Sequence, residues 1–222
     1  MQTADEGPPD KRLVDAFRKI PTPLISDALD ELGIDGGCHG IKSVSSQERM
    51  AGPAITLRCT PTNERKKGPH VGHYIDDVQA GNVMVIDNSG RTHYATFGGL
   101  IVLAAINRGA AGTVIDGVAR DVEDIMKYHY PLFSREYYMV AGKKRMVVES
   151  VNQEVQSSNI PVKSGDIVVG DQNGVLIIPK KRAEEVLEKA QAIVQEEQSI
   201  EKLVKGRMPL RDAVAQINKV QL

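Results

Sequence analysis

One stretch in the middle of the chain limits the possible folds more than any other, because it alternates strand, helix and strand. The apolar run NVMVID at residues 82–87 predicts a buried strand. GGLIVLAAINRGAAG at 98–112 then predicts a helix that begins at a glycine pair and ends at Gly109 or Gly112. TVID at 113–116 predicts the next strand. This spacing is typical of a βαβ unit, so we expect parallel strands joined by a right-handed crossover.

The rest of the chain adds helices before this unit, and antiparallel strands and further helices after it. Before it we expect two short helices in 10–32 that are broken at Pro21 and Pro23, a strand at 52–59 and a short helix at 73–81. After it we expect strands at 144–156 and around Pro161, a hairpin at 165–179 that turns at 171–174, and helices at 180–205 and 210–217. We therefore predict a single α/β domain over residues 1–222 with a mixed sheet and C-terminal helices, residues 1–10 being disordered.

Composition and charge exclude several classes of protein. The chain has 28 basic and 29 acidic residues, a balance that argues against a nucleic-acid partner. No apolar run approaches the ~20 residues of a membrane span, and the N-terminus has no signal-peptide pattern, so we expect a cytoplasmic protein with no membrane partner. Neither a G-x-G-x-x-G after a strand nor a P-loop is present, which argues against a nucleotide cofactor.

A glycine pair follows the first strand of the βαβ unit, and ligands in α/β sheets gather outside the carboxyl ends of strands. That strand is expected to end at Asp87 and to lead to Gly98 and Gly99. Backbone N–H groups at the start of the following helix would then bind a carboxylate. The alternative is that the two glycines only make a turn.

Three charged residues, Arg120, Asp121 and Asp124, follow the second strand. If a helix begins near Asp121, the two carboxylates lie on one face three residues apart, an arrangement that suits a hard cation such as Mg²⁺. The planar guanidinium of Arg120 would bind a carboxylate or a developing enolate. The alternative is an ordinary helix cap beside a surface ion pair.

A carboxylate interrupts the apolar stripe of the long C-terminal helix at Glu197. The other positions of the stripe are Val186, Ala190, Ile193, Ile200 and Val204. Because a buried carboxylate is costly unless it is paired, Glu197 is expected to reach a cation or the water shell of a metal, within the chain or across a subunit interface. The alternative is that this face of the helix is exposed to solvent by that turn.

The stretch ATFGGLIVLAAINRGAAGTVIDGVARDVEDI resembles the RraA-like family, which includes the class II 4-hydroxy-4-methyl-2-oxoglutarate aldolases and the regulator of ribonuclease E activity A. The likeness extends from PLISDALDELG through AGNVMVIDNSG to GDIVVGDQNGVLIIP and the closing helix, and the family motif is present as Gly99, Arg120, Asp121 and Asp124. The resemblance implies a β/β/α swivelling-type fold in a homotrimer or hexamer, with active sites at subunit interfaces and residues 180–222 at such an interface.

The resemblance also implies a role for each residue of the site. Asp121 would bind a divalent metal, Mg²⁺ or Mn²⁺, and Arg120 would hold the carboxylate and the carbonyl oxygen of the pyruvyl group. The backbone amides of Leu100 and Ile101 would contact the substrate. Glu197 best matches the acid that a neighbouring subunit brings to the water shell of the metal, with the adjacent Glu196 as the alternative.

One position departs from the aldolases, which carry Asp where this chain has Gly99. Decarboxylation of oxaloacetate needs only a metal that chelates the 2-oxo acid and an arginine that stabilises the enolate. The residues that this chain retains fit that reaction. We therefore expect a metal-dependent carbon–carbon lyase that releases pyruvate from a 2-oxo acid, with Arg120, Asp121 and Asp124 catalytic. Side chains that distinguish one 2-oxo acid from another are expected on loops such as NERKKGPHVGHY at 63–74. The alternative is a non-catalytic trimeric regulator that binds a ribonuclease or another protein.

Overall fold

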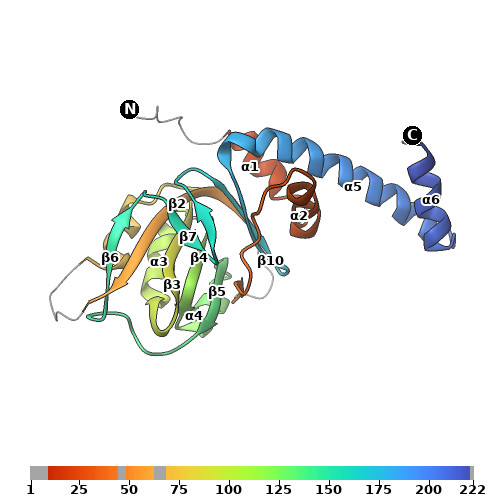
Figure 1. The fold of residues 1–222 in the computed structure, drawn as a ribbon. Helices are drawn as coiled ribbons and strands as arrows, with labels where there is room; N and C mark the ends of the chain where they lie inside the picture. The colour runs from red at the N-terminus through yellow and green to blue at the C-terminus, as the bar shows by residue number, and fades with distance from the viewer. Residues whose placement is uncertain (1–9, 45–48, 63–68, 221–222) are drawn as a thin grey trace, which may run out of the picture.

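The computed structural model describes residues 10–44, 49–62 and 69–220, which form an α/β fold (Figure 1). The expected disorder of residues 1–10 lies almost wholly outside this part of the chain. The helices are α1 (Lys11–Phe17), α2 (Thr22–Glu31), α3 (Gly99–Asn107), α4 (Val122–Lys127), α5 (Ala183–Lys205) and α6 (Leu210–Val220). The strands are β1 (Lys42–Ser43), β2 (Met50–Pro61), β3 (Val83–Phe97), β4 (Gly112–Ala119), β5 (Leu132–Tyr137), β6 (Met146–Val151), β7 (Val155–Ser157), β8 (Ile160–Val162), β9 (Ile167–Asp171) and β10 (Gly174–Ile178).

Eight of the described strands form one mixed sheet, as predicted. Its order is β1–β5–β4–β3–β2–β9–β10, and β6 pairs with β2. The strands β2, β3, β4 and β5 are parallel to their neighbours in that run, whereas β1, β6, β9 and β10 pair antiparallel. The parallel pair β3–β4 is joined by α3, so the βαβ unit, the mixed sheet and the C-terminal helices are confirmed.

Both strands of the βαβ unit run further than expected, and this corrects the position of the site. β3 does not end at Asp87 but continues to Phe97, through a bulge at which Ser89 and Gly90 have positive φ angles. β4 likewise continues beyond Asp116 to Ala119, which pairs with Phe97. The carboxyl edge of the sheet is therefore formed by Phe97 and Ala119, and the glycine pair and Arg120 follow it directly.

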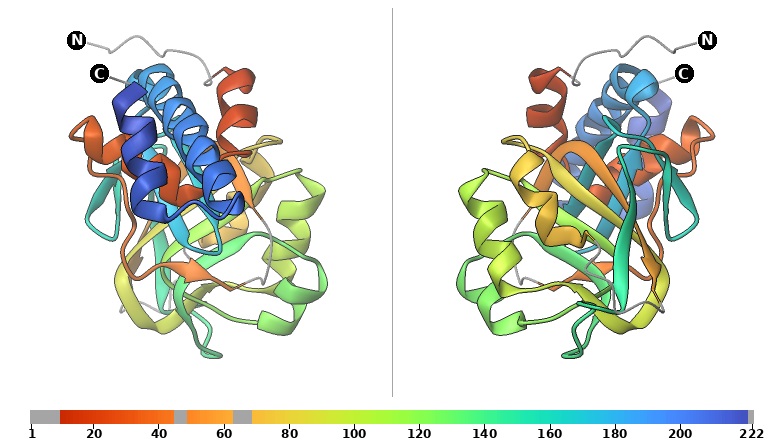
Figure 2. Two further views of the ribbon diagram at one scale, coloured as in Figure 1. Left: turned by 90° about the vertical axis from the view of Figure 1, so that its right-hand side faces the viewer. Right: turned by 90° about the vertical axis from the view of Figure 1, so that its left-hand side faces the viewer.

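Each face of the sheet packs against a different layer. On β3, Met84 and Ile86 belong to a core cluster under α3 and α4, whereas Val83 and Val85 belong to a cluster under the β7–β8 hairpin. A third cluster joins β9 and β10 to α1, α2 and α5. Helix α5 packs against α2 and, further along, against α6, and Figure 2 shows α5 and α6 away from α3 and α4. All eight residues of β4 are buried, as expected for a central parallel strand.

The prediction of a short helix at 73–81 is wrong. Two 3₁₀ turns occupy this region instead, η1 (Val71–His73) and η2 (Ile75–Asp77). The first turn is fixed by a capping box, in which His70 Nδ1 accepts from the Gly72 N–H at 3.1 Å and His73 Nδ1 accepts from the His70 N–H at 3.0 Å. These caps favour single tight turns over a continuous helix. Among the described helices, none is long and apolar enough to cross a membrane.

A buried carboxylate ties α2 to the β9–β10 turn, and its removal is expected to destabilise the fold. Asp171 accepts from the Thr22 N–H at 2.9 Å, from Thr22 Oγ1 at 2.7 Å and from the Asn173 N–H at 2.8 Å. Burial alone would raise the pKa of Asp171, but these hydrogen bonds outweigh it and lower the pKa. We expect Asp171→Asn to lower the free energy of unfolding by about 1–3 kcal/mol at neutral pH.

The pH dependence of this loss has a definite sign. Because the folded-state pKa of Asp171 lies below the unfolded value of about 3.9, the stabilisation is present above that pH and is lost as the pH falls through the folded-state pKa. Urea unfolding at pH 7 and at pH 3 measures the difference between wild type and Asp171→Asn. The difference should shrink at pH 3, and exposed Asp30→Asn is the control. A difference that is the same at both pH values would contradict the prediction.

Candidate active site

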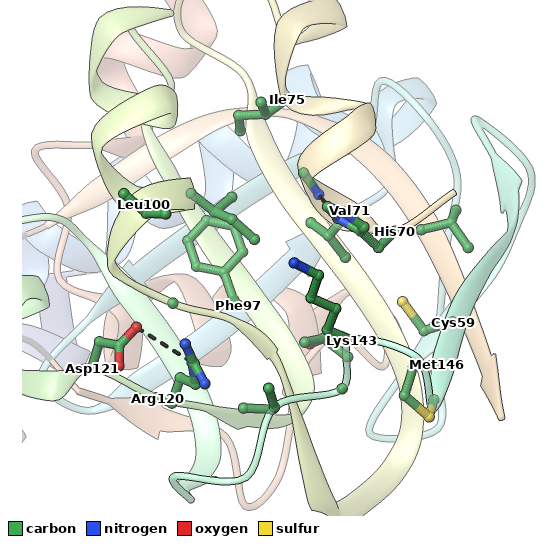
Figure 3. A pocket seen from close by; sticks show the side chains of 18 of the residues that line it. Cys59, His70, Val71, Ile75, Phe97, Leu100, Arg120, Asp121, Lys143 and Met146 are labelled. Atoms are coloured by element: carbon green, nitrogen blue, oxygen red, sulfur yellow. Dashed lines mark hydrogen bonds and ion pairs between the residues drawn. The ribbon is translucent and has the colours of Figure 1, made fainter. Parts of the chain in front are cut away.

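A cavity of about 380 Å³ lies at the carboxyl ends of β3 and β4, between α3, η1 and the β5–β6 loop. Arg120 and Asp121 line one end of it, Lys143 points into it between Phe97 and Val71, and Cys59 and Met146 lie on the far side (Figure 3). Much of the wall between them is apolar and includes Phe97. Partly open, mostly apolar cavities with a few polar groups are typical of small-molecule sites.

The local backbone turns the Asp121 carboxylate toward the neighbouring helix. Asp121 precedes α4 in the left-handed conformation, φ 58° and ψ 47°, and its side chain does not cap α4. Its Oδ2 atom instead accepts from the Gly99 N–H at 2.8 Å and lies 3.4 Å from Arg120 Nε. Asp is among the few residue types that adopt this conformation readily, and such strain often occurs at functional sites. Both side chains remain more than a third exposed.

The glycine pair lies in close contact with these charged side chains. A Cβ atom at Gly98 would lie 2.6 Å from Asp121 Oδ2 and 3.0 Å from Arg120 Cγ. A Cβ atom at Gly99 would collide with Asp124 Oδ2. The two glycines therefore let both carboxylates approach the start of α3. Binding of a substrate carboxylate by the glycine pair stays a prediction.

The two backbone amides expected to contact substrate differ in availability. The Ile101 N–H already donates to the Gly98 carbonyl at 2.9 Å. Among the described residues the structure gives the Leu100 N–H no partner. The amide of Leu100 is thus the better placed of the two for an anion, and Ile101 contributes its position in the cavity wall.

Comparison with known proteins adds to this geometry. Residues 22–177 match the RraA-like family, described as Aldolase/RraA. The chain belongs to the RraA-like family.

Individual relatives of this RraA-like protein agree with the assignment. It is 36% identical over 190 residues to protein DlpA of Legionella pneumophila, across 85% of this chain and 31% of DlpA, so it spans about a third of that relative. It is 34% identical over 174 residues to a Halalkalibacterium halodurans protein provisionally named 4-hydroxy-4-methyl-2-oxoglutarate aldolase, across 78% of this chain and 80% of that one. The crystal structure of an uncharacterized Pseudomonas syringae pv. tomato protein superposes with a TM-score of 0.86 at 36% identity, across 93% and 98% of the chains.

Three of the expected site residues of this RraA-like protein lie outside the cavity wall, and Gly99, whose N–H is engaged by Asp121, is one of them. Asp124 contacts Gly99 from α4 but does not line the cavity. Glu197 lies on α5, which packs against α1, α2 and α6 and extends away from the sheet in Figure 1. The Glu197 side chain is exposed. Within one chain this agrees with the alternative expectation, that this face of α5 is open to solvent at that turn. Contact between Glu197 or Glu196 and a metal in a neighbouring subunit stays a prediction.

The carboxylates of the site suit a divalent metal. Asp121 Oδ2 is engaged by Gly99 and Arg120, and the described residues supply no hydrogen-bond partner for Oδ1. Within the described ranges, no cluster of three or more His, Cys, Asp or Glu side chains would hold a metal alone. A hard cation that takes one or two protein carboxylates and completes its shell with substrate oxygens and water fits this donor set.

The structure adds residues to the cavity wall that the sequence analysis did not name. One of them, His70, lies in the loop at 63–74 that was expected to carry specificity side chains, and residues 63–68 of that loop lie outside the described residues. Thr96 Oγ1 is buried and has no hydrogen-bond partner among the described residues. Cys59 also lines the cavity, and burial raises the pKa of its thiol to about 12, so it is a neutral wall rather than a nucleophile. His70 and Lys143 come from two separate loops. Only folding brings these four together, and no motif in the sequence relates them.

A second cavity, of about 530 Å³, lies on the β7–β8 side of the sheet. A row of charged side chains crosses four neighbouring strands there: Arg58 on β2, Asp87 on β3, Asp116 on β4 and Arg135 on β5. Arg58 Nε lies 3.4 Å from Asp87 Oδ2, and Arg135 Nε donates to Asp116 Oδ1. Both carboxylates are about 95% buried, so each needs the positive charge of its arginine to offset the cost of burying a negative charge.

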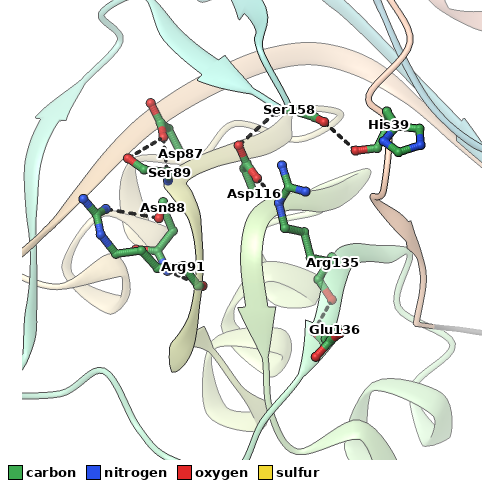
Figure 4. Close-up of polar contacts among 10 residues, drawn as sticks. His39, Asp87, Asn88, Ser89, Arg91, Asp116, Arg135, Glu136 and Ser158 are labelled. Carbon is green, nitrogen blue, oxygen red and sulfur yellow. Dashed lines mark hydrogen bonds and ion pairs between the residues drawn. The ribbon is translucent and has the colours of Figure 1, made fainter.

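The same row holds the β7–β8 hairpin against the sheet. The Gln156 N–H donates to Asp87 Oδ2 at 3.1 Å, and the Ser158 N–H donates to Asp116 Oδ2 at 2.9 Å. Figure 4 shows Asp116 between Arg135 and Ser158. Ser158 and Asn159 form the two-residue turn with φ angles of 52° and 70°, as in a type I′ hairpin. We interpret this network as structural.

Proposed function

We propose that this RraA-like protein is a divalent-metal-dependent carbon–carbon lyase that releases pyruvate from a 2-oxo acid, by aldol cleavage, by oxaloacetate decarboxylation or by both. The observation that carries the proposal is that the guanidinium of Arg120 and the carboxylate of Asp121 line one cavity together with Gly98 and Leu100 at the start of α3. Relatives of this chain that are named as aldolases support the same reaction class.

Arg120 and Leu100 would bind the reacting end of the substrate. Cleavage of the bond between C3 and C4 leaves negative charge on the oxygen at C2 as the enolate of pyruvate forms. The guanidinium of Arg120 offsets that charge from a fixed position, which is the point at which preorganised electrostatics lower a barrier most. The Leu100 N–H, at the positive end of the α3 dipole, holds the carboxylate at C1.

Asp121 would hold Mg²⁺ or Mn²⁺ at the same end of the cavity. When bound, the metal supplies a Lewis acid for the 2-oxo group. Asp124 lies against Gly99, at the position where the family aldolases carry their additional acid, and in this chain it supplies a carboxylate there. We assign to Asp124 the positioning of the water that exchanges the proton at C3, together with Glu197 of a neighbouring subunit.

A homotrimer or hexamer fits the surface around the cavity. Large apolar side chains on α3, on α4 and at or just after the end of β5 are exposed in the single chain: Leu100, which lines the cavity, and Leu103, Ile106, Met126, Tyr137 and Met139. Exposed apolar patches of this kind are typical of protein–protein interfaces. A neighbouring subunit seated on them would bring another copy of α5, and with it Glu197, toward Asp121.

Removal of the metal tests the proposal directly. Oxaloacetate and 4-hydroxy-4-methyl-2-oxoglutarate are each incubated with the protein and Mg²⁺ or Mn²⁺, and pyruvate is measured against metal alone, because metal ions decarboxylate oxaloacetate unaided. We expect EDTA to reduce pyruvate release to the protein-free rate and added metal to restore it. Asp121→Asn should raise the metal concentration required by about 10-fold or more, since one charged ligand is lost. Pyruvate release that is indifferent to EDTA would refute the metal-dependent lyase.

A second candidate function is favoured by Gly99, where the family aldolases carry Asp. A non-catalytic trimeric regulator would use the exposed apolar patch to bind a ribonuclease or another protein. In that case calorimetry would detect no Mg²⁺ binding, no 2-oxo acid would release pyruvate, and a ribonuclease of the E type would co-purify with the chain in a pull-down.

A further inference from the structure

The second cavity, on the β7–β8 side of the sheet, presents hydrogen-bond donors, because the buried carboxylates beside it are already engaged. Asp87 accepts from two backbone N–H groups, one through each of its carboxylate oxygens. Asp116 accepts from Arg135 Nε through Oδ1 and from a backbone N–H of the β7–β8 hairpin through Oδ2. All four carboxylate oxygens therefore have a donor already, and what remains free toward the cavity belongs to the arginines.

Three arginine side chains line this cavity and keep N–H groups unused. Arg135 uses Nε for Asp116, and the described residues supply no acceptor for its two Nη groups. Arg91 donates through Nη1 to a backbone carbonyl at 3.1 Å, and within the described ranges it has no carboxylate partner. Arg58 donates through Nη2 to a backbone carbonyl at 3.2 Å, but its Nε is buried without a hydrogen bond. A buried donor without an acceptor is costly, and a bound anion is one way in which proteins satisfy it.

The Arg135 guanidinium is held in place before any ligand binds. Asp116, about 95% buried, accepts from its Nε. A Cβ atom at Gly40 would lie 3.3 Å from Arg135 Nη1, and one at Gly90 would lie 3.4 Å from Nε, so the backbone of both glycines lies close against the guanidinium. An arginine that is fixed in this way loses little conformational entropy when its Nη groups bind an anion.

The donors are spread along the cavity, which suits a small molecule better than a single ion. Figure 4 shows the Arg91 and Arg135 side chains on opposite sides of Asp87 and Asp116. The volume of about 530 Å³ lies within the ~300–1,000 Å³ of ligand pockets. Uncharged hydroxyl and amide side chains also line the wall: Thr60, Ser89, Gln156 and Asn159. Such groups hydrogen-bond to the hydroxyl groups of a ligand.

We propose that this second cavity binds a sugar phosphate, that is, a phosphorylated polyhydroxy compound. The unused N–H groups of Arg58, Arg91 and Arg135 are the donors for phosphate, since a guanidinium matches phosphate in charge and in geometry. The hydroxyl and amide groups of the wall bind the sugar hydroxyls. The inference goes beyond the proposed function and does not depend on it, because none of these arginines lines the candidate active site.

Calorimetry on the full chain tests the site with three probes: ribose 5-phosphate, glucose 6-phosphate and fructose 1,6-bisphosphate. Ribose and inorganic phosphate are compared at equal ionic strength. We expect at least one sugar phosphate to bind about 10-fold more tightly than inorganic phosphate, and ribose to give no signal. Failure of all three sugar phosphates to bind would overturn the proposal. Equally tight binding of inorganic phosphate would show capture of a free oxyanion and overturn the assignment to a sugar phosphate.

Variants of the arginines assign the binding to this cavity. Arg91→Gln should weaken sugar-phosphate binding about 10-fold, and the variant should fold because Arg91 is exposed and pairs with no carboxylate in the part of the chain that is described. Arg135→Lys keeps a positive charge beside Asp116 but loses the spare Nη groups, and should weaken binding about 3-fold or more. Wild-type affinity in both variants would overturn the proposal.

Two further changes serve as matched controls. Glu149→Gln removes a negative charge at the rim of the cavity and should strengthen binding about two-fold, whereas weaker binding would contradict an anionic ligand. Arg211→Gln is the same chemical change as Arg91→Gln at an exposed position of α6, outside the cavity wall, and should leave the affinity unchanged. An equal loss in Arg211→Gln and Arg91→Gln would show non-specific attraction only.

Binding in the candidate active site is excluded separately, because Cys59 lines both cavities. Arg120→Ala and EDTA should each leave the sugar-phosphate affinity unchanged, since Arg120 does not line the second cavity. Loss of binding in Arg120→Ala would place the ligand in the first cavity and overturn the proposal. Pyruvate release is not part of this readout, so failure of the lyase and failure of the sugar-phosphate site are distinguishable.

Discussion

Arg120→Ala is expected to lower kcat for pyruvate release by about 10³-fold, with a smaller change in KM. The guanidinium lies in the cavity wall, 3.4 Å from Asp121 Oδ2. The negative charge that it would stabilise on the substrate develops fully only as the enolate forms. An interaction that strengthens in the transition state affects kcat more than binding. Steady-state assays with oxaloacetate and with a 4-hydroxy-2-oxo acid, at saturating Mg²⁺, measure the effect.

Two further variants show whether the loss of kcat in Arg120→Ala comes from the guanidinium itself or from the removal of any nearby charge. Arg120→Lys keeps a positive charge but loses the planar fork, so we expect it to recover about a tenth or more of the lost rate. Glu123→Gln removes a neighbouring exposed charge on α4 and should leave kcat within about two-fold of wild type. Thermal melting shows whether each variant is folded. A folded Arg120→Ala that keeps wild-type kcat would exclude Arg120 from the chemistry.

Asp116→Ala is expected to give the largest loss of stability, about 3 kcal/mol or more in the free energy of unfolding. Asp116 is about 95% buried, and it joins Arg135 to the Ser158 N–H. Its removal leaves a partly buried guanidinium and a hairpin amide without their acceptor. In a chain of this length the melting temperature should fall by about 6–12 °C, which calorimetry or urea unfolding measures.

A double-mutant cycle separates the pair from general damage. Replacement of both partners, in Asp116→Ala with Arg135→Met, should cost less than the sum of the single changes by about 1 kcal/mol or more, because no uncompensated charge remains. Exposed Glu149→Gln, at the rim of the same cavity, is the control and should change stability by less than about 0.5 kcal/mol. Additive effects of Asp116 and Arg135 would show that the two side chains do not act together.

Most of the fold could be predicted because each element carries a local signal. The apolar run of β4, the amphipathic pattern of α5 and the turn between β9 and β10 are each complete within a few residues. The predictions were wrong at places where contacts outside the local segment decide the secondary structure. β3 continues past Asp87 because β4 and the Arg58 side chain engage it there, and η1 replaces a helix because two histidine rings cap its turn.

The placing of Arg120 and Asp121 in the candidate site could be predicted, whereas that of Lys143 could not. Arg120 and Asp121 are adjacent in sequence and follow a strand, so pattern alone brought them to the edge of the sheet, and folding adds the Gly99 N–H that holds Asp121. His70 and Lys143 lie 73 positions apart by their residue numbers, 143 − 70, and meet only because both loops pack over β3. The position of Glu197 relative to the site depends on how subunits assemble, so its role stays a prediction.

The sequence by itself determined the parallel βαβ unit, the family and the identity of the charged groups, since periodicity and adjacent residues suffice for these. The tertiary structure alone decided which charges share a cavity and which are paired within the sheet. Arg120 and Arg135 look alike in the sequence, yet one lines the candidate active-site cavity while the other is paired with Asp116. The physical reason is that a charge acquires its role from burial and from its neighbours, and both are set by contacts between residues far apart along the chain.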